Sequence, residues 1–236
     1  MQTMRHTMSE GRSQTQRVGD FFQKLSPVAL KDLESFEHPT LMPAGRVLFS
    51  EKQTPPGIFI IHSGEVKLSI NSSDGKRLIL RIARPGEILG LTSALSGCPC
   101  EMTAETLYPA RIAAIARRDF LGFLLRHPEV YQAVTEELSL QLSMACEQLR
   151  TVGLSSSAPE KLARLLLDMS EHGQKTDRGT RFRFSLTHEE IGEFIGTSRE
   201  TVTRTLSVFK HRQLVAFEGS TLTIPNRVAL ESFANC

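Results

Sequence analysis

The amino-acid sequence predicts an α+β chain with an N-terminal antiparallel β-barrel, a long dimerisation helix and a C-terminal winged helix-turn-helix. Short β-rich runs alternate with turn signals over residues 40–115. Helical periodicity then runs from about 127 to 152, far beyond the average helix length. Two short amphipathic helices joined by a glycine turn follow at 186–209. The expected units are an arm (1–18), a β domain (19–117), a dimerisation helix region (118–153) and the C-terminal domain (154–236).

Composition excludes several classes of protein. The chain has 236 residues, of which 40% are hydrophobic and 23% charged, as in ordinary globular proteins. It contains no apolar run near the ~20 residues that span a bilayer and no apolar signal-peptide segment, so we expect a cytoplasmic protein without a membrane partner. Four cysteines in a chain of this length do not indicate a disulfide scaffold. The common nucleophile, zinc-protease and P-loop motifs do not occur, and we expect no enzymatic activity.

The N-terminal third reads as a polar arm, two small helices and then strands. Phe21, Phe22 and Leu25 mark the first helix, and Pro27 opens the second. Asp74-Gly75 is a hairpin signal, because glycine tolerates a positive φ. Strands are expected at 47–49, 58–61, 66–70, 78–82 and 111–115. Their short length and near-regular spacing favour a closed or sandwiched antiparallel fold.

The long helix carries an apolar seam. Leu140 and Met144 lie off this seam and are expected to face the β domain. Because apolar residues on two faces need two surfaces to bury them, we expect a second copy of the helix as partner; the alternative is a core helix of a monomer. The small residues at 153–159 are the best hinge candidate. The seam consists of Val134, Leu138, Leu142, Ala145, Leu149 and Val152.

The most specific stretch begins at Leu186. Thr187 and Glu190 form the sequence pattern of a capping box at the start of a short helix, and Gly196 is placed to end that helix. In the next helix Val202, Leu206 and Phe209 form an apolar face. The opposite face carries Arg199, Glu200, Thr203 and Arg204. Arginine can bond guanine and glutamate can accept from cytosine in a major groove, whereas the alternative is a solvated amphipathic helix.

The remaining C-terminal segments are expected to complete a winged domain. A helix is expected around 162–169, and alternation at Phe182 and Phe184 indicates a short strand. Two β-rich runs at 214–217 and 221–224, separated by Glu-Gly-Ser, read as the wing hairpin. A final short helix is expected at 228–233.

This order of segments, together with IGEFIGTSRETVTRTL, resembles the cyclic-AMP receptor protein and FNR superfamily of bacterial transcription regulators. His62-Ser63-Gly64-Glu65-Val66 and Pro85-Gly86-Glu87 sit where that family keeps barrel turns. The resemblance implies a double-stranded β-helix (jelly roll) of the cyclic-nucleotide-binding type. It also implies a homodimer that binds palindromic double-stranded DNA through two recognition helices about 34 Å apart. RNA polymerase is a further expected partner if the regulator activates transcription.

The resemblance also assigns roles to residues. Arg199, Glu200 and Arg204 match positions that read a TGTGA-like half-site, and Thr203 shares their face. His188 stands where the family often has arginine, so its phosphate contact should be weaker near neutral pH. The expected contacts to the DNA backbone are Thr187, His188, Ser198, Thr201, Lys210, His211 and Arg212.

The effector is not evident from the sequence. Cyclic-nucleotide binders carry a glutamate for the ribose and an Arg-Ser or Arg-Thr pair for the phosphate, but Leu91 and Glu101-Met102 occupy these positions. Burying a phosphodiester without a cation is costly, so we expect no cyclic-AMP binding in the family mode. Residues 1–40 contain no cysteine, which argues against the iron–sulfur cluster of the oxygen-sensing branch.

Three alternatives for signalling remain open. The thiols of Cys98, Cys100 and Cys146 could sense redox state, although cysteine is more commonly a small buried hydrophobe and C-x-C alone is no metal signature. Haem could bind through His62 or His6, or the regulator could be insensitive to any signal. In the mechanism we expect, a signal in the barrel shifts the long helices at the hinge and reorients the recognition helices. The expected effector-pocket residues are Arg81, Gly86, Glu87, Leu91, Cys98, Cys100 and Cys146.

Overall fold

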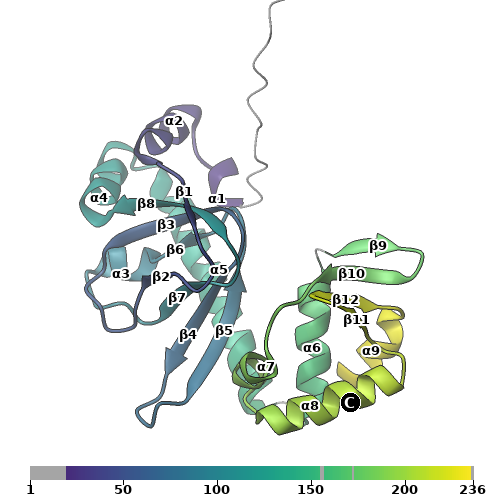
Figure 1. Ribbon diagram of the computed structural model, residues 1–236. Coiled ribbons are helices and arrows are strands. Elements are labelled where there is room, and N and C mark those ends of the chain that lie inside the picture. The colour runs from purple at the N-terminus through teal and green to yellow at the C-terminus, as the bar shows by residue number, and fades with distance from the viewer. Residues whose placement is uncertain (1–19, 155–156, 172, 235–236) are drawn as a thin grey trace, which may run out of the picture.

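The computed structural model describes residues 20–154, 157–171 and 173–234 (Figure 1). An N-terminal β sandwich lies on one side and a smaller C-terminal domain on the other, and helix α5 (Val130–Leu154) runs from the first toward the second. The expected α+β class is therefore confirmed, with two packed sheets rather than a closed barrel. The expected arm (1–18) and His6 lie outside the described residues. No helix among the described residues is long and apolar enough to cross a bilayer.

The β domain consists of two four-stranded antiparallel sheets. The first has the order β1 (Thr40–Met42), β8 (Ala110–Ala116), β3 (Gly57–Ser63) and β6 (Ile88–Leu89). The second has the order β2 (Val47–Phe49), β7 (Thr103–Thr106), β4 (Val66–Asn71) and β5 (Arg77–Ala83). Every strand expected from the sequence is present, whereas β1, β6 and β7 were not expected. They are only two to four residues long, too short for a clear alternation.

Helices cover the sandwich. They are α1 (Asp20–Gln23), α2 (Pro27–Phe36), α3 (Leu91–Ser96) and α4 (Arg117–Arg126). Ser26 caps α2 by accepting a hydrogen bond from the backbone N–H of Ala29 at 3.2 Å. Phe120, Phe123 and the first two turns of α5 pack with them in one apolar cluster. This cluster fixes the start of α5 on the β domain.

The apolar seam of α5 is only partly as expected. Val134 is 2% exposed and belongs to the core of its own β domain, so its assignment to an intermolecular seam was wrong. Farther along, Leu142 and Leu149 are 67% and 63% exposed. Met144 lines a pocket against the β domain, as expected, whereas Leu140 is 48% exposed and does not line that pocket. The C-terminal half of α5 therefore presents an uncovered apolar stripe.

The C-terminal domain packs four helices and one sheet around a single core. The helices are α6 (Ala158–Ser170), α7 (His188–Ile195), α8 (Arg199–His211) and α9 (Arg227–Ala234), with the end of α5 beside them. The sheet has the order β11 (Ala216–Glu218), β12 (Thr221–Ile224), β10 (Gly179–Arg183) and β9 (Gln174–Thr176). Val202, Leu206 and Phe209 are buried in this core. Of the hinge candidate (153–159), residues 153–154 belong to the end of α5 and residues 158–159 begin α6, and residues 155–156 lie outside the described residues.

Candidate nucleic-acid interface and effector pocket

The helix-turn-helix forms because its local sequence satisfies the helix ends. Thr187 accepts a hydrogen bond from the backbone N–H of Glu190 at 3.1 Å, and the Glu190 carboxylate accepts one from the backbone N–H of Thr187 at 2.9 Å. This is the expected capping box. Gly196 ends α7 with a φ of 65°. A Cβ on Gly192 would lie 2.7 Å from the carbonyl oxygen of Thr197, so glycine lets the turn close against α7.

One face of α8 is buried and the opposite face is free. Ser198 caps the helix by accepting from the backbone N–H of Thr201 at 3.2 Å. The four residues expected to read bases are all exposed and share one stripe along the helix: Arg199, Glu200, Thr203 and Arg204. Ser207, one turn beyond Thr203, extends this stripe and was missed from the sequence. Its spacing of four residues from Thr203 was the signal available.

The acidic member of the stripe stays ionised. A hydrogen bond from the backbone N–H of Glu200 and one from the Ser198 side chain hold the pKa of the Glu200 carboxyl below its ordinary value. The Arg199 charge acts in the same direction. The first turn of α8 therefore offers cationic donors beside an anionic acceptor, which is the chemistry that distinguishes G·C pairs by their major-groove edges.

Two contacts fix the orientation of Thr203. Its hydroxyl donates to the backbone carbonyl of Arg199 at 2.9 Å. Since a hydroxyl has a single proton, the His188 Nδ1 atom, 2.8 Å from the same oxygen, is the donor in that pair. His188 thus links the first turn of α7 to the exposed face of α8, and Thr203 retains acceptor capacity only.

The other expected backbone-contact residues have varied surroundings. The Lys210 ammonium lies 4.5 Å from the centre of the Phe217 ring, and the Arg212 guanidinium lies 5.4 Å from that of Phe233. These cation–π contacts hold both charges at the C-terminal end of α8. His211 is exposed. The hydroxyl groups of Thr187 and Ser198 form the helix caps already described, and the Thr201 hydroxyl lies 3.1 Å from that of Ser198.

An apolar pocket lies between the second sheet, α3 and α5. Its cavity volume is about 60 Å³. Its lining includes Phe49, Leu68, Leu80, Leu89, Met102 and Met144. Gln141 of α5 reaches across to donate to the carbonyl oxygen of Ile88 at 3.1 Å. The wall of this pocket therefore connects the β domain directly to the long helix.

The structure brings some of the expected effector residues together and separates others. Arg81 and Leu91 line the apolar pocket, and the Arg81 guanidinium is paired with the Glu87 carboxylate. Gly86 lies in the turn before β6, with a φ of 90°, and does not line the apolar pocket. Arg81 is the sole cation among the described residues of the lining. Its charge is already neutralised, so the pocket offers no free cation to a phosphate.

The three cysteines of the described residues, Cys98, Cys100 and Cys146, form no disulfide. Cys98 and Cys146 are exposed, whereas Cys100 is buried with its Sγ atom 3.7 Å from the Ser93 hydroxyl. None of the three lines the apolar pocket, which corrects their assignment to it. Among the described residues, no three His, Cys, Asp or Glu side chains are placed to hold a metal ion. His62 is paired with Glu37 at 2.9 Å, outside the pocket lining.

Comparison with known proteins agrees with this arrangement. Residues 160–233 match the Crp-like helix-turn-helix domain, and residues 40–127 match the cyclic nucleotide-binding domain. The chain belongs to the Crp/Fnr family. It is a DNA-binding transcription regulator of this family.

Several Crp/Fnr relatives match over most of the chain. A protein named CRP-like cAMP-activated global transcriptional regulator, from Mycobacterium tuberculosis, is 28% identical over 204 residues, covering 86% of this chain and 91% of the relative. The probable transcriptional regulator flp of Lacticaseibacillus casei is 25% identical, with coverages of 92% and 96%. The structure of FixK2 from Bradyrhizobium japonicum has a TM-score of 0.74 at 21% identity, with coverages of 84% and 96%. This last likeness supports the fold alone.

Proposed function

We propose that this Crp/Fnr regulator is a homodimer that binds a palindromic operator with TGTGA-like half-sites. The observation that carries the proposal is the free stripe on α8, whose opposite face is locked into the core by Val202, Leu206 and Phe209. A helix anchored in this way presents its side chains at fixed positions to the edges of bases.

Within each half-site we assign specific tasks to the stripe. Arg199 and Arg204 donate to guanine O6 and N7, and Glu200 accepts from cytosine N4. Thr203, as an acceptor with a methyl group, contacts a neighbouring base. The assigned backbone contacts are Thr187, His188, Ser198, Thr201, Lys210, His211 and Arg212, which fix the register of the helix.

The second recognition helix comes from a second copy of the chain. Leu142 and Leu149 are exposed one heptad apart on α5, which supports helix pairing at this stripe. Two identical subunits related by a twofold axis match a palindrome, because each presents the same α8 surface to one half-site.

The controlling signal is a small molecule other than cyclic AMP. Some relatives carry the description cAMP-activated, but the pocket of this chain is mostly apolar, its Arg81 is paired with Glu87, and Glu101 stands at its edge. A phosphodiester in this pocket would face a carboxylate and find no free cation. The signal acts on α5 through Met144 and Gln141, which line the pocket.

Fluorescence anisotropy tests the proposal with a duplex that carries two inverted TGTGA half-sites whose centres are about 10 bp apart. We expect salt-dependent binding of two chains per duplex and markedly weaker binding to a scrambled duplex. Isothermal titration with cyclic AMP should give no tight binding. Equal affinity for both duplexes contradicts the DNA assignment, and tight cyclic-AMP binding contradicts the effector assignment. An affinity unchanged by oxidants, nitric oxide and cell-extract metabolites would favour a signal-insensitive regulator.

A further inference from the structure

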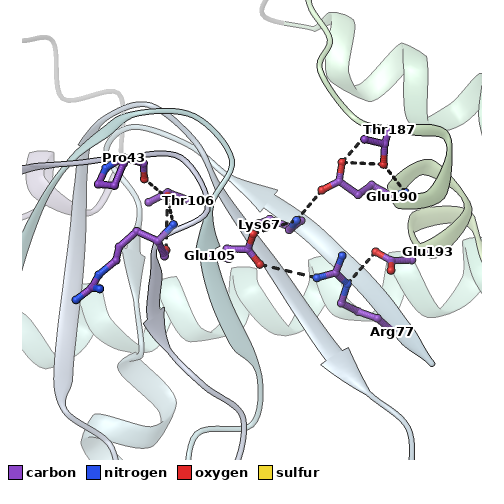
Figure 2. Close-up of polar contacts among 9 residues, drawn as sticks. Pro43, Lys67, Arg77, Glu105, Thr106, Thr187, Glu190 and Glu193 are labelled. Carbon is purple, nitrogen blue, oxygen red and sulfur yellow. Dashed lines mark hydrogen bonds and ion pairs between the residues drawn. The ribbon is translucent and has the colours of Figure 1, made fainter. Parts of the chain in front are cut away.

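The sheet face of the β domain that meets α7 carries a charged cluster (Figure 2). Lys67 alternates with the core residues Val66 and Leu68 on β4, so its side chain should point outward into solvent. It is nevertheless only 3% exposed, because the C-terminal domain covers it. A lysine this deeply buried requires partners.

The partners of Lys67 come from both domains. Its Nζ atom lies 2.7 Å from Oε1 of Glu190 on α7 and 3.5 Å from Oε1 of Glu105 on β7. Glu105 is directly opposite Lys67 in the antiparallel ladder. The neighbouring Thr106 donates to the carbonyl oxygen of Pro43, which helps to hold β7 in place (Figure 2). Lys67 therefore bridges a fixed carboxylate of its own domain and a carboxylate of the DNA-binding domain.

A second ion pair lies beside the first. The Arg77 Nε atom on β5 donates to Oε2 of Glu193 at 2.9 Å, and its Nη1 lies 3.8 Å from Glu105 (Figure 2). Glu190 and Glu193 are three residues apart on α7, so they point from the same face of the helix. Two cations of strands β4 and β5 thus form ion pairs with one face of α7.

The contact between α7 and the β domain is connected to the apolar pocket. Gln148 of α5 donates to the carbonyl of Ile79 on β5 at 3.1 Å and to that of Phe194 on α7 at 2.8 Å. Leu80 and Arg81, the next residues on β5, line the apolar pocket. A change in the pocket wall therefore acts on the strand that holds α7.

The docked position also crowds the recognition helix. Gly75, Lys76 and Arg77 of the β4–β5 hairpin share a groove with Arg199 and Glu200 at the start of α8. A major groove about 12 Å wide admits a single helix, so a hairpin beside the start of α8 limits how closely that end of the helix can approach DNA. The hairpin tip brings no net positive charge there, because Asp74 pairs with Lys76 at 2.8 Å.

We propose that Lys67 and Arg77, gripping Glu190 and Glu193, form an electrostatic latch that holds the DNA-binding domain in a low-affinity position until it is released. The effect of the latch on affinity rests on the proposed operator binding. The docking of the DNA-binding domain on the β domain can be measured without DNA. Release leaves Lys67 with Glu105 and frees α7 to move with α8.

Neutral and reversed charges test the latch in the full-length protein. Glu190→Gln combined with Glu193→Gln removes both carboxylates while keeping the cap of α7, because glutamine also completes a capping box. Arg77→Glu breaks the more exposed pair, and Arg77→Glu with Glu193→Arg restores it in reverse. Glu136→Gln is the matched control, since it breaks the 2.7 Å pair with Lys24 within the N-terminal unit.

Small-angle X-ray scattering reports docking, and anisotropy with the inverted-TGTGA duplex reports affinity. We expect the double variant Glu190→Gln with Glu193→Gln, and the single variant Arg77→Glu, to have a larger radius of gyration than the wild type. Both should also bind the duplex more tightly than the wild type, by roughly the 5- to 150-fold typical of allosteric coupling. The reversed pair and the control should behave like the wild type. Unchanged scattering, or affinity unchanged or weakened in folded variants that undock, overturns the latch. Wild-type protein that ignores the duplex while the variants still undock overturns the proposed function instead.

A crosslink tests independently whether the docked position has the lower affinity for DNA. Arg77→Cys and Glu193→Cys can be joined by a short bis-maleimide in a Cys98→Ser, Cys146→Ser and Cys236→Ser background, which leaves only the buried Cys100 of the native thiols. The joined protein should bind the duplex more weakly than the same protein with its thiols capped singly. Equal or tighter binding by the joined protein overturns the proposal that the docked position is the low-affinity one.

Discussion

The Nδ1 atom of His188 lies 2.8 Å from the hydroxyl oxygen of Thr203, and this contact joins the two helices of the helix-turn-helix. The pair lies where the N-terminus of α7 meets the free stripe of α8. Each side chain therefore helps to hold the other in the position from which it meets DNA.

This pair predicts non-additive effects on operator affinity. His188→Ala and Thr203→Val should each weaken binding, but the double variant should lose about 1 kcal/mol less than the sum, the net value of one hydrogen bond. Anisotropy titrations of the wild type, the two single variants and the double variant complete this double-mutant cycle. Strict additivity would contradict the coupling and leave His188 as an independent phosphate contact.

The close approach at Gly192 predicts a stability effect. A methyl group there would meet the carbonyl oxygen of Thr197 at 2.7 Å, so Gly192→Ala should lower the free energy of unfolding by about 1–3 kcal/mol. Gly122→Ala is the control, because its Cβ would meet only the end of the Arg126 side chain, at 3.5 Å. That helical substitution should stabilise by roughly 0.5–1 kcal/mol. Urea unfolding of both variants checks the contrast, and equal effects would contradict it.

The apolar stripe on α5 predicts the oligomeric state. Leu142→Lys with Leu149→Lys should convert the dimer to a monomer, because it places charges in the proposed helix pair. Leu125→Lys, at a residue of α4 that is 76% exposed, should leave the dimer intact. Sedimentation velocity distinguishes these outcomes. A monomeric wild-type protein, or a dimer that survives the double substitution, would contradict the pairing.

The latch predicts a dependence on pH. Burial by itself raises the pKa of Glu190, but hydrogen bonds from Lys67 and Thr187 and the Lys67 charge outweigh it and lower the pKa. The groups around this carboxylate include Lys67, Thr187 and Glu105. A lowered pKa stabilises the folded, docked state above the ordinary glutamate value of about 4.3, and this contribution is lost as the pH falls through the lowered pKa.

The difference in unfolding free energy between wild type and Glu190→Gln measures that contribution. It should be constant from pH 7 down to about 5, then shrink in more acidic solution as Glu190 becomes protonated in both states. A difference that stays constant down to pH 3 would show that the Glu190 charge does not stabilise docking.

The sequence predicted the elements whose local chemistry is strong. The capping box at Thr187, the glycine turn at Gly196 and the apolar face of α8 were all read correctly, since they depend on neighbours within one or two turns. Strands of two to four residues were missed because so few positions carry no periodicity. Val134 was misplaced because a heptad spacing does not reveal which apolar surface covers it.

The interdomain contacts could not be predicted in the same way. Lys67 has the sequence context of a solvent-facing strand residue, and only the tertiary packing of α7 buries it. Glu190 was assigned to a cap, which it forms, but its second oxygen also binds Lys67. Residues far apart in sequence reveal such double roles only in the folded chain.

Base recognition by the free stripe of α8 is tested most directly by selecting binding sites for wild type and Arg199→Ala from a random duplex library. We predict that the wild type selects inverted repeats with G·C pairs at fixed positions. Arg199→Ala should lose about 1–3 kcal/mol and relax its preference at one position in each half-site. A wild type without sequence preference, or a variant weakened equally on every duplex, would contradict base reading by α8.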